Sequence, residues 1–136
     1  MKKKIVITGG EGRFAQVLKR DNKKLDILYP SKKELNILNI NSINKYLKKN
    51  KPKYLIHAAA LSRPMNIHDR QISKSIDLNI IGTANIVKVC SELKIKLIYF
   101  STGYVYEGKI GNYKEIDKSI KFYGNCNYAK YLKNLI

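Results

Sequence analysis

The 136-residue sequence has few of the features that mark secreted, membrane or metal-binding proteins. Its two cysteines, Cys90 and Cys126, form no CxxC pair and have no histidine at ligand spacing, so neither a disulfide framework nor a metal site is expected. No apolar run approaches the ~20 residues of a membrane span. The opening MKKKIVITGG has too short an apolar stretch for a signal peptide. These absences favour a reduced, cytoplasmic setting.

Acidic residues are also scarce, because ten Asp and Glu face 27 Lys and Arg and give a formal net charge of +17. Such a charge attracts phosphates, nucleic acids or anionic membranes. The lysines are spread along the chain in ones to threes, as at residues 2–4, 23–24 and 32–33, without one dense block. This spread is typical of compositional bias, and a dedicated nucleic-acid surface is not expected.

The order of the expected elements alternates between strands and helices. The length and the 44% apolar content fit one domain, residues 1–136, with a real core. Short β-branched and apolar runs predict strands at residues 4–8, 25–29, 35–40, 54–58 and 96–101. Helices are predicted at residues 12–20, 41–50, 73–93 and 123–136.

The predicted helix at residues 73–93 has an apolar face at helical spacing, made of Ile76, Ile80, Ala84, Val87 and Cys90. Parallel strands need crossover connections, which helices supply here. The fold class predicted is therefore α/β, a doubly wound parallel sheet with helices on both faces.

Residues 8–15, TGGEGRFA, directly follow the first predicted strand and open the first predicted helix. Gly9 permits a tight turn, Gly12 lets the backbone approach a pyrophosphate, and Ala15 is small enough for the helix to pack on the strand. The free N–H groups of the helix start, where Arg13 and Phe14 lie, would face the phosphates. In this context the pattern predicts a dinucleotide coenzyme rather than a bare tight turn.

The ribose of such a coenzyme is read at the end of the second strand. There the chain reads YPSKK, residues 29–33, without the carboxylate that would bond the 2′-hydroxyl of NAD. Ser31 and Lys32, together with Arg13, can instead hold the 2′-phosphate of NADP. Because lysine is common throughout the chain, chance placement remains an alternative, so NADP is expected and NAD stays open.

Five stretches together resemble a known family: TGGEGRFA, LIHAAALSRP, DLNIIGTANIV, LIYFSTGYVYEG and YGNCNYAK, in this order along the chain. In these motifs the sequence resembles the extended short-chain dehydrogenase/reductase family of nucleotide-sugar epimerases, dehydratases and reductases, and within it the dTDP-4-dehydrorhamnose reductase-like proteins. The resemblance implies a Rossmann fold and an NAD(P)-dependent reaction on a nucleotide sugar.

The resemblance also implies a role for each matching position. The implied coenzyme set is Asn36, Ile37, Ala58, Ala59, Ala60 and Asn79, of which Asn79 would brace the neighbouring backbone. The implied substrate set is Ser62 and Arg63, and the implied catalytic set is Thr102, Tyr123 and Asn127. The simpler alternative is that HAAAL and STGYVY are ordinary strand ends. His57 is expected to be a hydrogen-bonded core residue rather than a catalyst.

The stretch FYGNCNYAK departs from the family at one position, because Asn127 stands where the family has a lysine four residues after Tyr123. In the family's scheme that lysine bonds the nicotinamide ribose and lowers the pKa of the tyrosine, which is about 10 when unperturbed. Asn127 can supply the hydrogen bond but not the charge, so acid–base catalysis is expected to be weakened. Lys130, seven residues and roughly 10 Å beyond Tyr123 along the same predicted helix, is a less favourable substitute.

Family members usually continue into a carboxyl-terminal region that closes over the sugar nucleotide, whereas this chain ends in the helix that carries Tyr123. The last strand would then be an open edge, which favours a homo-oligomer or a partner chain. Three interpretations follow: an NAD(P)-dependent enzyme acting on a nucleotide sugar, a catalytically inactive dinucleotide-binding module acting with a partner, and a basic nucleic-acid binder. Fold alone cannot choose among them.

Overall fold

The computed structural model describes residues 3–62, 64, 66–100 and 114. The chain divides into two units, Met1–Ser62 with Ser73–Phe100, and Arg63–Ile72 with Ser101–Ile136. The first unit contains the sheet and the helices that pack on it. In the second unit, one short helix lies within the described residues, α3 at Ile67–Arg70.

The described part of the first unit contains a parallel sheet of four strands, in the order β2-β1-β3-β4. The strands are β1 at Ile5–Thr8, β2 at Ile27–Leu28, β3 at Tyr54–His57 and β4 at Lys96–Tyr99. The chain moves outward from β1 to β2 and then crosses over to β3, so the strand order reverses between β1 and β3. In open α/β sheets a ligand crevice forms at such a reversal, at the carboxyl ends of the strands.

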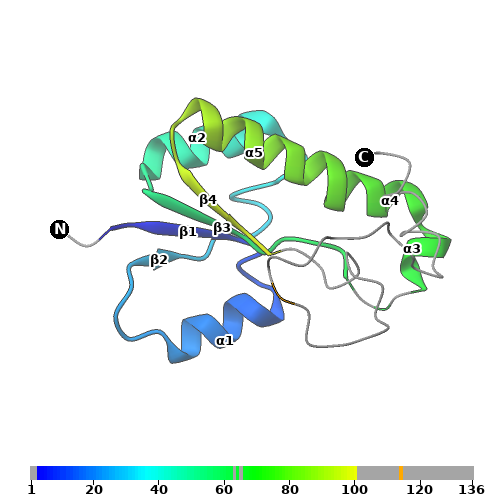
Figure 1. Cartoon of the computed structure of the whole chain (residues 1–136), viewed down its shortest axis with the longest axis horizontal. Helices are drawn as coiled ribbons and strands as arrows, with labels where there is room; N and C mark the ends of the chain where they lie inside the picture. The colour runs from blue at the N-terminus through cyan, green and yellow to red at the C-terminus, as the bar shows by residue number, and fades with distance from the viewer. Residues whose placement is uncertain (1–2, 63, 65, 101–113, 115–136) are drawn as a thin grey trace. The chain divides into compact units, whose positions relative to one another are not determined.

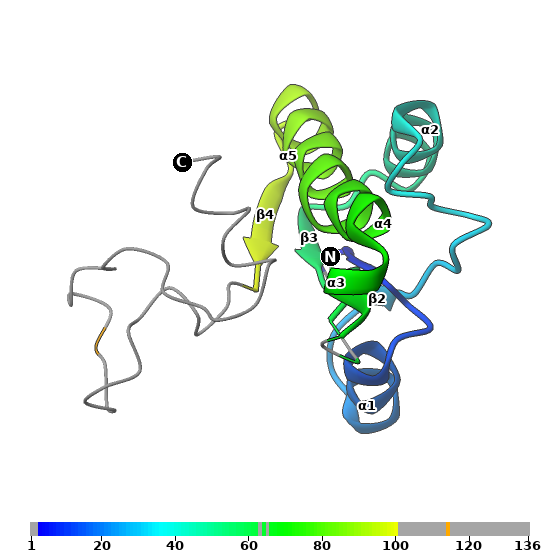
Figure 2. The same cartoon turned by 90° about the vertical axis from the view of Figure 1, so that its right-hand side faces the viewer.

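Helices cover both faces of this sheet (Figures 1 and 2). Helix α1, Arg13–Asp21, lies on one face, whereas α2, Ile40–Asn50, and α5, Gly82–Glu92, lie together on the other. The core between the sheet and these two helices is fully apolar and includes Val6, Leu55, Ile43, Leu47, Ile86 and Val89. The predicted doubly wound α/β fold is therefore confirmed.

The predicted strand at residues 35–40 is wrong, because this segment is a loop in the structure. Its alternating apolar residues Leu35 and Ile37 are buried, as in a strand, but its backbone groups bond to side chains or within the loop, where the N–H of Leu35 donates to the carbonyl of Ser31 at 3.0 Å. The N–H of Asn36 donates to Ser42 Oγ at 3.1 Å, and the carbonyl of Ile37 accepts from Asn85 Nδ2 at 3.0 Å. Hydrogen bonds to these side chains thus take the place of the bonds that a neighbouring strand would make.

The predicted helix at residues 41–50 is confirmed with a shifted start. Asn39 caps α2, since its side chain accepts a hydrogen bond from the N–H of Ser42 at 3.0 Å. At the other end Lys51 adopts a left-handed conformation with φ 45°, and buried Pro52 follows. The strands predicted at residues 25–29, 54–58 and 96–101 are shorter in the structure by one to three residues, and the helix predicted at residues 123–136 lies outside the described residues.

The predicted helix at residues 73–93 forms, but it buries a different face. It consists of α4 (Ile72–Ile76), a π-helical turn η1 (Asp77–Ile81) and α5. The buried positions include Ser75, Gly82, Ile86 and Val89. The predicted face was wrong at Ala84 and Val87, which are exposed.

The reason for this error is that the core-facing side of the helix begins with small and polar residues. Gly82 leaves space for Ile37, because a Cβ at Gly82 would lie 2.6 Å from Ile37 Cδ1. Asn79 and Ser75 make hydrogen bonds instead of apolar contacts. The solvent side carries the more obvious apolar stripe, which includes Ile81 and Val87. No helix within the described residues has both the length and the apolar character to cross a membrane.

Two neighbouring residues of α5 test the assignment of this buried face. Replacing Ile86, which is fully buried, by alanine is expected to lower the free energy of unfolding by about 2–5 kcal/mol, because a cavity remains in the core. Replacing Val87, which is 48% exposed, by alanine should change it by no more than about 0.5 kcal/mol. Urea denaturation followed by circular dichroism measures both, and equal losses would contradict the assignment.

Candidate functional site

A cavity of about 220 Å³ opens at the carboxyl ends of β1 and β3, where the strand order reverses. The glycine turn after β1, the loop after β2 and the backbone after β3 form its walls. The lining residues are Gly9, Gly10, Glu11, Gly12, Lys32, Leu35, Asn36, Ile37, Ala59, Ala60 and Leu78. A groove of about 630 Å³ shares Glu11, Lys32 and Asn36 with the cavity and extends toward the start of α2. Together they form one elongated site.

The glycine turn is shaped by close backbone contacts that leave no room for side chains. Gly9 has φ +70°, and a Cβ there would lie 3.0 Å from Ala59 Cα. A Cβ on Gly10 would lie 2.6 Å from the carbonyl oxygen of Pro30. The turn is closed by the N–H of Gly12, which donates to the carbonyl of Gly9 at 2.8 Å. These contacts bring β1, the loop after β2 and the end of β3 together around one turn.

Helix α1 begins directly at this turn, with Gly12 as its N-cap residue. Its first turn contains no acidic residue, and its amide N–H groups have no partner within the helix. Gln16 fixes the turn from the helix side, because its Nε2 donates to the carbonyl of Gly10 at 2.7 Å. A helix start of this kind suits an anion such as a pyrophosphate.

The hydroxyl of Thr8, the last residue of β1, ties the turn to β3. Its oxygen accepts hydrogen bonds from the N–H groups of Ala58 and Ala59, both at 3.2 Å. It also lies 2.7 Å from Nδ1 of His57. Since both acceptor positions of the oxygen are occupied by amides, the hydroxyl proton must point to Nδ1. The small residues that form the cavity wall after β3 are therefore held by β1.

The other nitrogen of His57 continues this network toward η1. Nε2 lies 3.0 Å from Oγ1 of Thr83, and that hydroxyl donates its own proton to the carbonyl of Asn79 at 2.9 Å. Nε2 must then carry the imidazole proton, which makes His57 a neutral ring with fixed donors and acceptors. Burial lowers the pKa of His57 from 6.5 to about 4. The expectation that His57 is a hydrogen-bonded core residue is confirmed.

Asn79 holds the segment that leaves the cavity wall. Its Oδ1 accepts from the N–H of Leu61 at 2.8 Å, and its Nδ2 donates to the carbonyl of Leu61 at 2.9 Å. One amide side chain thus satisfies both backbone groups of a residue that lies outside any strand. The side chain projects from the π-helical turn η1, a distortion often found at functional sites.

Family membership follows from a comparison of the sequence with known proteins. Residues 2–130 match the family described as RmlD substrate binding domain. The chain belongs to this family. Its match to the RmlD family covers most of the sequence, including the positions outside the described residues at which catalytic roles were implied.

Three relatives illustrate the similarity. The dTDP-4-dehydrorhamnose reductase of Aggregatibacter actinomycetemcomitans is 27% identical over 118 residues, which are 84% of this chain and 40% of that protein. The methionine adenosyltransferase 2 subunit beta of Xenopus laevis is 33% identical over 92 residues, 66% of this chain and 27% of that protein. The crystal structure of dTDP-4-dehydrorhamnose reductase from Bacillus anthracis in complex with NADP superposes with a TM-score of 0.73 at 29% identity, over 80% of this chain and 39% of that chain. This chain thus spans less than half the length of each of these three relatives.

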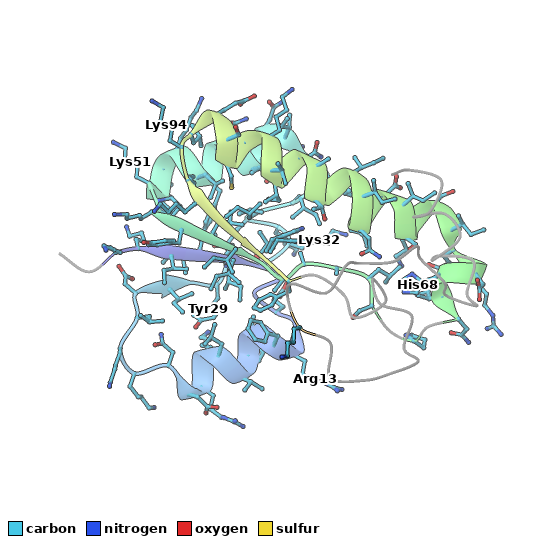
Figure 3. The ribbon with its side chains drawn as sticks, in the orientation of Figure 1. Arg13, Tyr29, Lys32, Lys51, His68 and Lys94 are labelled. Carbon is cyan, nitrogen blue, oxygen red and sulfur yellow. The ribbon has the colours of Figure 1, made fainter. Side chains whose placement is uncertain are left out.

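The structure brings most of the residues expected at the coenzyme to the elongated site. Those that line the cavity or the groove are Gly9, Gly12, Ser31, Lys32, Asn36, Ile37, Ala59 and Ala60. Ala58 and Asn79 hold the backbone next to it. Figure 3 shows Arg13 at the start of α1 and Lys32 in the loop after β2, both at the carboxyl end of the strands.

Other expected residues lie elsewhere. Arg13 and Phe14 are exposed and do not line the cavity, and Phe14 instead makes an edge-to-face contact with Phe100, with ring centroids 4.9 Å apart. Ser62 is exposed and also lies outside the cavity lining. Arg63, Thr102, Tyr123 and Asn127 fall outside the described residues, so their catalytic and substrate roles remain predictions.

The residues of the site that the sequence analysis missed include Thr8, Gly10, Glu11 and Thr83. Thr8 and Thr83 look like ordinary polar residues of a strand and a helix, and only their shared contact with His57 reveals their role. The sequence shows Gly10 as the second of two adjacent glycines. The structure shows why glycine is required there, since any side chain would collide with the backbone of Pro30. The role of Glu11 was not predicted because Lys32, whose N–H donates to its carboxylate, lies 21 positions further along the chain.

The neutral state of His57 predicts a pH dependence of stability. Because the folded-state pKa of about 4 lies below the ordinary 6.5, the network contributes fully above pH 6.5, and its contribution falls as the pH drops toward 4. The free energy of unfolding should fall by about 2–3 kcal/mol over this window from His57 alone, at 1.36 kcal/mol per pKa unit. Urea denaturation at a series of pH values measures this loss.

The variant His57→Gln isolates the histidine from the carboxylates that titrate in the same range. It should be less stable than the wild type at pH 7, and the difference between the two proteins should shrink as the pH approaches 4. A difference that stays constant from pH 7 to pH 4 would contradict a neutral, buried His57.

Proposed function

We propose that this chain binds a nicotinamide dinucleotide coenzyme and acts in the reduction of a nucleotide-linked keto sugar. The observation that supports this most is the cavity where the strand order reverses, walled by the glycine turn, the start of α1 and the small residues Ala59 and Ala60. The geometry suits a pyrophosphate at the helix start and an adenosine along the groove after β2. Membership of the RmlD family supports the same ligand class.

Reduction, rather than epimerisation or dehydration, is the reaction that the names of the relatives support. The reductase from Bacillus anthracis was solved with NADP, and the relative from Aggregatibacter actinomycetemcomitans is also named a reductase. When bound, the coenzyme supplies the hydride for the substrate carbonyl. Both relatives are more than twice as long as the segment that matches, so the sugar itself is a proposal at the level of class.

The chain's own residues have two tasks in this scheme. The turn at Gly9–Gly12 and the network of Thr8 and His57 position the coenzyme and keep the wall after β3 in place. Thr102 would bond the substrate oxygen and Tyr123 would give it a proton, roles that rest on the family motifs. Asn127 in place of lysine leaves the phenol of Tyr123 without the neighbouring cation that favours proton exchange near neutral pH.

Calorimetric titration with NADH and NADPH, with a nucleotide sugar in a second step, tests this function. The wild type should bind at least one of the two coenzymes and turn over slowly. The variant Asn127→Lys should raise kcat by about 10²-fold, the lower range of general acid–base catalysis, with little change in coenzyme affinity.

A matched control is Asn125→Lys, which adds the same charge two residues earlier and should leave kcat unchanged. If neither coenzyme binds, the proposed function is wrong. If a coenzyme binds but Asn127→Lys gains no turnover, the binding role stands and the catalytic role of this chain does not.

A second candidate function is that of a coenzyme-binding subunit that completes a partner chain. One relative, the methionine adenosyltransferase 2 subunit beta of Xenopus laevis, is by name a subunit of an enzyme. In the described part of the sheet, β4 pairs with β3 alone, and Ile98, Tyr99 and Phe100 are 44–54% exposed at this edge. Ile81 and Val87 of the adjacent helical segments are exposed as well. Such an edge favours pairing with another chain.

Light scattering after size exclusion tests whether this edge pairs with a second copy of the chain. We expect the chain to self-associate at micromolar concentration, and the double variant Ile98→Lys with Val87→Lys to shift the mass toward the monomer, because charge on an edge opposes association. The control Lys51→Glu, at the opposite end of the strands (Figure 3), should leave the mass unchanged. A monomeric wild type would count against self-association.

A further inference from the structure

An acidic side chain from the glycine turn lies beside the loop after β2, although the stretch YPSKK at the start of that loop contains no carboxylate. Glu11 belongs to the glycine turn, yet its carboxylate Oε2 accepts a hydrogen bond from the N–H of Lys32, in the loop after β2, at 3.3 Å. Glu11 is also one of three residues that line both the cavity and the adjoining groove. A carboxylate therefore stands beside the end of β2, where the adenosine ribose of a dinucleotide is read.

The donors that a 2′-phosphate would use in this loop are already bonded to carboxylates. The N–H and the hydroxyl of Ser31 both donate to Oε2 of Glu34, at 2.8 and 2.9 Å. These two bonds hold the pKa of Glu34 below its usual value. The N–H of Lys32 is bonded to Glu11. A phosphate at this place would have to displace one carboxylate or the other.

A free ribose hydroxyl meets a different environment. It can donate a hydrogen bond to the carboxylate of Glu11 without displacing it, because a carboxylate accepts several hydrogen bonds at once. A 2′-phosphate is itself an anion and would be repelled by the same group. The side chains of Lys32 and Lys33 attract either coenzyme. Because they and Glu11 are all exposed, solvent screens the attraction and the repulsion alike, and Glu11 differs from the lysines in its hydrogen bond to the loop.

We infer that Glu11 is the residue that determines coenzyme specificity in this chain, and that it favours NAD(H) over NADP(H). This inference rests on the proposed function and makes its coenzyme class more specific. It assigns to the glycine turn the task that an acidic residue at the end of the second strand usually has. It also differs from the expectation of NADP that the absence of a carboxylate in YPSKK suggested.

The test compares the affinities of NADH and NADPH, and of AMP and adenosine 2′,5′-bisphosphate, by calorimetry at low ionic strength. The second pair removes the nicotinamide half and reports on the ribose alone. The wild type should bind NADH at least as tightly as NADPH. The variant Glu11→Gln keeps a carbonyl oxygen for the N–H of Lys32 and removes only the charge. It should shift the affinity ratio toward NADPH by about tenfold, or 1.4 kcal/mol.

Glu92→Gln is the matched control, since it removes the same charge at the end of α5, from an exposed residue that lines neither the cavity nor the groove. It should change the affinities of both coenzymes by a similar factor. A wild type that prefers NADPH by more than tenfold, or an affinity ratio that Glu11→Gln leaves within twofold, would overturn the role of Glu11. Absence of binding by all four ligands would overturn the proposed function itself, and this inference with it.

Discussion

The hydroxyl of Thr8 is the interaction on which the geometry of the site depends. It accepts the amides of Ala58 and Ala59 and donates to His57, so the end of β1 fixes the path of the chain after β3. The glycine turn starts at the next residue, and Gly9 contacts the same segment closely. If the hydroxyl were missing, two partly buried amides would lose their acceptor, at a cost of about 1 kcal/mol each. The width of the crevice between β1 and β3 is therefore set by hydrogen bonds rather than by apolar packing alone.

The sequence predicted the elements whose signals are local. The strands β1 and β3, the glycine turn and helix α2 all depend on neighbouring residues, and each was found near its predicted place. The prediction of a strand at residues 35–40 was wrong because backbone groups of this segment bond to side chains of α2 and α5 rather than to a neighbouring strand. The predicted buried face of the helix was partly wrong because Gly82 is buried for close packing and the partly buried Asn79 makes hydrogen bonds. A search for regularly spaced apolar residues does not detect either role. Contacts with residues distant in the sequence contributed to both errors, as the pairing of Glu11 with Lys32 also illustrates.

The electrostatics of the site differ from those of the chain as a whole. The sequence carries a formal charge of +17, yet the loop that would receive the adenosine ribose holds two carboxylates on its backbone and hydroxyl donors. In the proposed role of Glu11, a general attraction for phosphates would be combined with local rejection of a phosphate at one position. Selectivity of this kind comes from a repulsive element placed against the wrong ligand, rather than from stronger contacts with the right one.

The central claim is that the turn at Gly9–Gly12 and the wall at Ala58–Ala60 bind a dinucleotide together. Nuclear magnetic resonance of the ¹⁵N-labelled chain, titrated with NADH to saturation, tests it most directly. The account predicts that the amide signals of these two segments and of Lys32 shift, while those of Lys51 and Lys94 at the opposite end of the strands (Figure 3) do not. Shifts confined to the lysines at that opposite end, or no shifts at all, would contradict it.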